Sequence, residues 1–97
     1  MITGKTSNGF EYKIDEKAFQ DWDYVDLVIK MNRTDDNIER LDCIKDVVRI
    51  LFPGEELERL KAFLREKNNG YAPIDEIANM YKEITESVSE QNKEVKK

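Results

Sequence analysis

The chain has 97 residues, which is enough for one domain with a modest core and too few for two. Its 21 acidic residues outnumber its 16 basic ones, giving a formal net charge of −5, and an acidic surface repels the phosphate backbone of a nucleic acid. The sequence contains no histidine and a single cysteine, Cys43, so the usual general base, the commonest metal ligand and an internal disulfide are all excluded, as expected in a reducing compartment.

The first 14 residues are expected to form a β-hairpin ahead of the helices. Phe10, Tyr12 and Ile14 alternate with charged residues, which is typical of a strand with one buried face. Asn8-Gly9 precedes them, and both residues tolerate the positive φ of a tight turn. Because an isolated two-stranded hairpin is only marginally stable, this one must pack on the helices or stay partly mobile.

The first helix is predicted over residues 15–32, with Asp15 as its N-cap. Its apolar face is wider than one partner helix needs, so either the helix is central in the bundle or part of the face serves another chain. We expect Trp22 at the centre of the core, whereas Tyr24 suits the core and a partner surface about equally. The main stripe consists of Ala18, Trp22, Val25, Val28 and Ile29, and a second stripe beside it of Tyr24, Leu27 and Met31.

Proline and acidic residues set the boundaries of the remaining helices. Asp36 can cap the second helix, which must end near Phe52 because the residue before a proline is pushed out of the helical region. Gly70 can close the third helix in the left-handed conformation, and Pro73 suits the first turn of the fourth. These signals place the helices at residues 35–52, 54–68 and 73–90.

The expected architecture is therefore mainly α, a compact bundle of about four helices preceded by a short N-terminal hairpin. Residues 1–14 would form the hairpin, residues 15–88 the helical domain, and residues 89–97 a flexible tail in which the apolar signal fades.

No motif for catalysis, cofactor binding or metal binding is present. The sequence has no phosphate-binding loop, dinucleotide turn or paired-cysteine zinc pattern, and Cys43 has no histidine to activate it. Solvated helix faces explain the many carboxylates. No run approaches the ~20 apolar residues that span a bilayer, and no signal peptide is recognisable. We expect a cytoplasmic protein that is not an enzyme, needs no cofactor and binds neither membrane nor nucleic acid.

The order of motifs resembles a known family. An acidic-aromatic segment surrounds Trp22 and Tyr24, Phe52-Pro53-Gly54 leads into a short leucine-containing helix, and Ala72-Pro73 starts the last helix. Together these features resemble the small tail assembly chaperones of long-tailed, non-contractile bacteriophages, chiefly those of Gram-positive hosts. The resemblance covers residues 8–88.

The resemblance implies a small helical, non-catalytic chaperone in the bacterial host cytoplasm. Such a protein binds the tape measure protein, keeps its apolar stretches soluble, and can recruit tail tube protein. We expect Tyr24, Leu27 and Met31 to line the surface for that protein partner or for a homo-oligomer. Two alternatives remain open: a structural adaptor or connector subunit of the phage particle, and an acidic helical regulator that binds other proteins.

Overall fold

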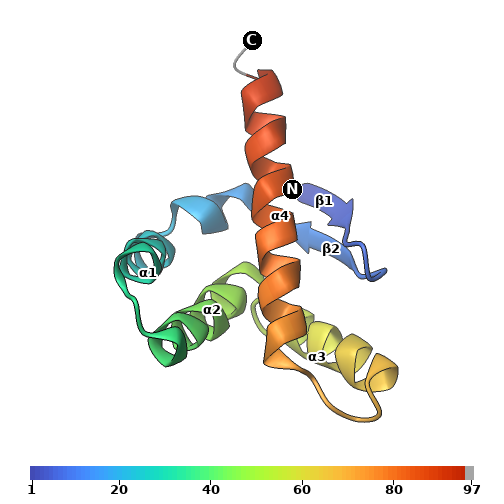
Figure 1. The fold of residues 1–97 in the computed structure, drawn as a ribbon. Helices are drawn as coiled ribbons and strands as arrows, with labels where there is room; N and C mark the ends of the chain where they lie inside the picture. Colours follow the sequence, from blue (N-terminus) through green and yellow to red (C-terminus); the bar gives the residue numbers. More distant parts are fainter. Residues whose placement is uncertain (96–97) are drawn as a thin grey trace.

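The computed structural model describes the backbone of residues 1–95 and the side chains of residues 1–89. It confirms the expected class, with four α-helices and an antiparallel N-terminal hairpin over the described residues (Figure 1). The elements in chain order are β1 (Ile2–Lys5), β2 (Glu11–Ile14), the 3-10 helix η1 (Glu16–Gln20), α1 (Trp22–Arg33), α2 (Asn37–Leu51), α3 (Glu55–Lys67) and α4 (Ile74–Val95). Within the described part, no helix is both long and apolar enough to cross a membrane.

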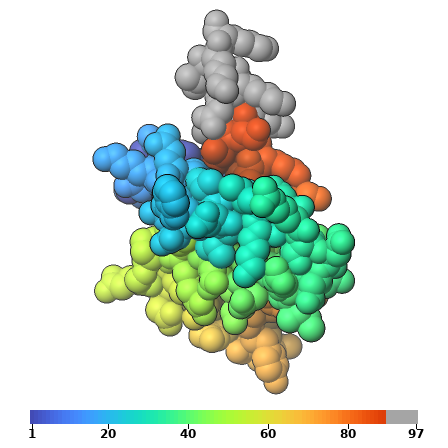
Figure 2. All heavy atoms as spheres, turned by 90° about the vertical axis from the view of Figure 1, so that its left-hand side faces the viewer, coloured from blue at the N-terminus to red at the C-terminus, as the bar shows by residue number. Residues whose placement is uncertain are grey.

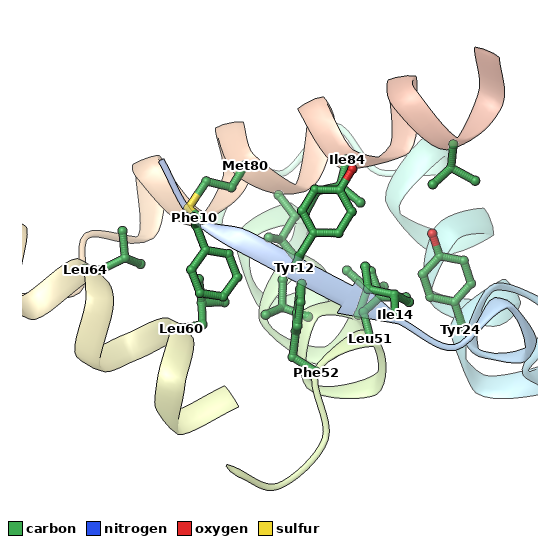
Figure 3. Packing of buried hydrophobic residues seen from close by; sticks show 14 residues of the cluster. Phe10, Tyr12, Ile14, Tyr24, Leu51, Phe52, Leu60, Leu64, Met80 and Ile84 are labelled. Atoms are coloured by element: carbon green, nitrogen blue, oxygen red, sulfur yellow. The ribbon is translucent and has the colours of Figure 1, made fainter. Parts of the chain in front are cut away.

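The hairpin is an integral part of the hydrophobic core. Strand β2 runs between α4 on one side and α2 and α3 on the other (Figure 3). Phe10, Tyr12 and Ile14 all point to the buried face, as their alternation predicts. The ring of Phe10 meets those of Phe52 and Phe63 at centroid distances of 6.1 and 5.3 Å. The marginal stability of an isolated hairpin is thus offset by aromatic packing against the helices.

Polar contacts fix the hairpin turn to the helices. The backbone N–H of Ser7 donates to Glu83 at 2.6 Å, and the Asn8 side-chain amide donates to Glu76 at 2.7 Å. Glu76 also accepts from Asn68 at 3.0 Å and lies 3.6 Å from the Lys67 ammonium. The hydrogen bond from Asn8, then that from Asn68, and the nearby Lys67 charge lower the pKa of Glu76.

The predicted first helix of residues 15–32 is wrong in one respect, because it is two elements. Asp15 caps only the short η1, and the backbone is extended at Asp21. The Asp21 carboxylate then accepts from the backbone N–H groups of Asp23 and Tyr24, at 3.1 and 3.3 Å. Aspartate favours an N-cap because it satisfies these unpaired donors, and here that preference ends one helix and starts another.

The boundaries of α2 and α3 follow the predicted signals closely. Asp36 caps α2 by accepting from the N–H of Ile38 at 2.9 Å. Helix α3 ends with Asn69 and Gly70 both at positive φ, and the N–H of Gly70 donates back to the carbonyl of Arg65. That bond, with Asn69 in the left-handed conformation, defines a Schellman motif. The backbone at Gly54, also at positive φ, makes the corner between α2 and α3.

Helix α4 crosses the centre of the molecule and is longer than predicted (Figure 1). It runs from Ile74 to Val95, past residue 90. The backbone of the tail expected at residues 89–97 is therefore helical as far as Val95. The remainder of that predicted tail, residues 96–97, lies outside the described residues.

Helix α1 buries the second of its two adjacent apolar stripes and exposes most of the one that was expected to face the core. Tyr24 is buried at 7% exposure, whereas Trp22 is 80% exposed, so the prediction that Trp22 is at the centre of the core is wrong. Trp22 is the first residue of α1, directly after the Asp21 cap, and its position on the helix directs it away from the bundle. Val25 and Ile29 of the same stripe are exposed with it.

Candidate functional site

The structure does not bring Tyr24, Leu27 and Met31 together as an open surface. Leu27 and Met31 are half-buried and pack against the core, and Tyr24 belongs to the core itself. The Tyr24 hydroxyl lies 2.9 Å from that of Tyr81, and the Phe19 ring meets the Tyr24 ring edge-on at 5.4 Å. Tyr24 is therefore not free to contact a partner.

Burial perturbs both phenols of this pair. Desolvation is the main cause that raises the pKa of Tyr24, and the hydrogen bond with Tyr81 raises it further. Desolvation also raises the pKa of Tyr81, although its hydrogen bond with Tyr24 acts in the opposite direction. Both groups remain neutral at physiological pH, so they serve packing and have no acid–base role there.

The apolar stripe that α1 does expose contains Trp22, Val25 and Ile29. These residues are three and four apart and share one side of the helix. Helix α1 forms the outer surface on this side of the molecule (Figure 2). We call these three residues the α1 stripe.

A larger apolar feature lies between α2, α3 and the start of α4. It is an open groove of about 620 Å³. Ile38, at its edge, is 80% exposed, which is unusual for an isoleucine in a folded domain. The apolar residues that line the groove are Ile38, Leu41, Val48, Leu57, Leu60, Ala72, Ile74 and Ile77.

The rim of the groove is basic, although the chain as a whole is acidic. Among the described residues, four cations border it, Lys45 and Arg49 from α2 and Lys61 and Arg65 from α3, against one acid, Asp42. Arg49 pairs with Asp46 on its own helix at 2.8 Å, and Lys61 with Glu58 at 3.6 Å. Among the side chains that the structure describes, neither Lys45 nor Arg65 forms an ion pair.

The groove has the composition of a binding site for a protein segment. An apolar floor with a polar, charged rim is typical of grooves that receive an amphipathic helix. Cys43 is buried and does not line the groove. Across the described residues, no group of three histidine, cysteine or acidic side chains is arranged to hold a metal ion.

Periodicity in the sequence assigns the groove residues to helix stripes but does not reveal the groove. Leu41, Leu57 and Ile77 have the spacing of core residues, and the structure leaves them only half-buried. A signal is nevertheless present in the sequence, because the pattern Leu-x-x-x-Lys-x-x-x-Arg occurs twice. It covers residues 41–49 in α2 and residues 57–65 in α3, the two helices that border the groove.

No protein family, curated protein or solved structure matches the chain.

Proposed function

We propose that the protein is a non-catalytic binding protein, a phage tail assembly chaperone whose groove between α2, α3 and α4 holds an apolar helical segment of the tape measure protein. The observation that carries this proposal is the open groove itself, with its apolar floor and charged rim. A chaperone of this type must present apolar surface to its client and still remain dissolved. The apolar floor of the groove meets the first requirement, and the charged residues around it meet the second.

The groove suits this role better than the face first expected on α1. Tyr24 is buried and hydrogen-bonded, so it cannot contact a client without disrupting the core. Ile38, in contrast, is almost fully exposed and lines the groove. Exposed apolar side chains around a concave surface favour protein recognition.

Co-expression tests the proposal directly. The chain would be produced with the tape measure protein encoded in the same genome, and the soluble, co-purifying tape measure protein would be quantified. Ile38→Asp places a charge in the groove at an exposed position, so it should reduce co-purification without unfolding the protein. Val25→Asp makes a similar change on the α1 stripe, outside the groove, and is the matched control.

The co-purification results test the binding surface and the chaperone role separately. Loss of the tape measure protein with Ile38→Asp alone supports the groove. Loss with Val25→Asp alone would move the binding surface to α1 and overturn the groove. If the unmodified chain neither binds nor solubilises the tape measure protein, the chaperone proposal is wrong.

The α1 stripe favours a second candidate, a structural subunit that stays in the phage particle. Exposed Trp22, Val25 and Ile29 have the character of a permanent subunit interface. Mass spectrometry of purified particles separates the two candidates. A chaperone should be absent from the finished particle, whereas a connector subunit should remain in fixed proportion to the other structural proteins.

A further inference from the structure

The two walls of the groove carry the same charge pattern. Helix α2 presents Lys45 and Arg49 at four-residue spacing, and α3 presents Lys61 and Arg65 at the same spacing. Residues four apart lie one above the other on a helix face, so each pair forms a short row along its helix. The apolar floor thus has a row of cations on each side.

These cations are incompletely neutralised within the chain. Asp42 is the only acid that lines the groove among the described residues. Lys45 and Arg65, one from each wall, are exposed and form no ion pair with the described side chains. In a chain with a net charge of −5, such a local excess of positive charge is a specific feature of this surface.

We infer that the groove binds an amphipathic helix of a protein partner whose apolar face is flanked on both sides by aspartate or glutamate. This inference rests on the proposed function and states the chemistry of the client segment. Apolar side chains of the helix would cover the floor, and its flanking carboxylates would meet the cations of both walls. Such charge complementarity fixes the register and orientation of the helix more than it adds affinity.

Two other occupants fit less well. A single-stranded nucleic acid is typically held by aromatic side chains on which its bases stack, and none of the described residues that line this groove is aromatic. A second copy of the chain could offer its α1 stripe, but Lys30 and Arg33 follow Asp23 and Asp26 along that helix. The mixed charges of α1 do not complement a groove with cations on both walls.

The test uses three designed helical peptides with identical apolar faces. Their flanking positions carry glutamate, glutamine or lysine, and their affinities for the full chain are measured by fluorescence anisotropy at low and high salt. We expect the glutamate peptide to bind roughly tenfold more tightly than the lysine peptide at low salt, and the difference to shrink as salt rises. A single-stranded oligonucleotide serves as a further probe.

Charge-reversal variants test whether the groove cations cause the preference for the glutamate peptide. Lys45→Glu with Arg65→Glu reverses two groove cations that have no ion pair among the described side chains, one on each wall. Lys13→Glu with Arg33→Glu makes the same change in net charge at exposed positions outside the groove. The groove variant should lose the preference for the glutamate peptide or reverse it, and the control variant should keep most of it. Circular dichroism verifies that both variants are folded.

The results separate this inference from the proposed function. Equal binding of the three peptides, or loss of preference in the control variant alone, would overturn the inference. Oligonucleotide binding that Lys45→Glu with Arg65→Glu abolishes would overturn it as well, and so would a dimer in light scattering that the same variant dissociates. If tape measure protein binds the groove variant and the unmodified chain equally tightly, the chaperone role stands and the inference of an acidic client helix is wrong. If the glutamate peptide is preferred but no tape measure protein binds, the preference for an acidic helix stands and the chaperone role is wrong.

Discussion

The hydroxyl groups of Tyr24 and Tyr81 lie 2.9 Å apart, and their hydrogen bond joins α1 to α4. With the Phe19 ring against its edge, Tyr24 is held from two directions in the interior. This arrangement fixes the rotation of α1 about its own axis. As a result, Tyr24 faces inward while the α1 stripe faces solvent.

Replacing either tyrosine of this pair should destabilise the protein. In Tyr24→Phe or Tyr81→Phe the remaining hydroxyl loses its partner, and we expect the free energy of unfolding to fall by about 1 kcal/mol in each case. The double variant should lose less than the sum, since no orphaned hydroxyl remains. Denaturant unfolding at neutral pH measures all three. Strictly additive losses would indicate that the hydrogen bond contributes nothing.

Alkaline pH should weaken the fold through the same pair. Burial raises the pKa of Tyr24 above its unfolded value of about 10, so folding favours the neutral phenol. The resulting stabilisation is fully present below about pH 10 and is lost as the pH rises further, because the unfolded chain ionises first. Unfolding experiments at pH 8 and pH 11 should show a smaller loss for Tyr24→Phe than for the unmodified protein. An equal loss in both would contradict this assignment.

Trp22 should behave as a surface residue. Trp22 is 80% exposed, so acrylamide, a neutral quencher that the flanking carboxylates do not repel, should quench its fluorescence efficiently in the native state. Trp22→Ala should change the free energy of unfolding by no more than about 0.5 kcal/mol. Leu64→Ala, at a fully buried position of α3, is the contrasting variant and should cost about 2–5 kcal/mol. Protection of Trp22 from acrylamide would show that another chain covers the α1 stripe.

Gly4 should not tolerate a side chain. Its cross-strand partner is Tyr12, whose ring lies over it, and a Cβ atom at Gly4 would lie 2.6 Å from the ring carbon Cζ and closer still to the phenol oxygen. Because Tyr12 is itself buried, the ring cannot simply swing away, and Gly4→Ala should cost about 1–3 kcal/mol. Thermal unfolding measures the loss. Thr3→Ala, at an exposed neighbouring position, is the control and should cost much less.

Acid should release the hairpin turn from the helices. The pKa of Glu76 is lowered by the hydrogen bond from Asn8, by that from Asn68 and by Lys67, so its carboxylate stabilises the fold above the unfolded value of about 4.3. That stabilisation is lost as the pH falls below this value, when the folded carboxylate is protonated. The difference in stability between the unmodified protein and Glu76→Gln should therefore shrink between pH 7 and pH 3. Glu86→Gln, at an exposed position of α4, should show no comparable change.

Local signals in the sequence predicted where the helices begin and end better than which face of each helix is buried. Asp36, Pro53 and Gly70 act through their own backbone neighbours, so the boundaries they set could be recognised without knowing the fold. The inward face of α1 depends on Tyr81, 57 residues after Tyr24 in the chain. Two adjacent apolar stripes on α1 offered comparable burial, and periodicity alone cannot choose between them.

The groove could not be predicted from the sequence, because it depends on how the helices pack against one another. Whether Leu41 and Ile77 are fully covered or border a groove is decided by the angle between helices, which no single helix encodes. The repeated Leu-x-x-x-Lys-x-x-x-Arg pattern was visible in the sequence, but its meaning required knowing that α2 and α3 form opposite walls.

The placement of β2 between α4 and the other helices has a consequence for biosynthesis. Phe10 and Ile14 leave the ribosome well before Met80 and Ile84, which help to enclose the same core (Figure 3). The nascent chain must carry β2 without its α4 cover until α4 has emerged, so the native core can close only after residues 80–84 have been made.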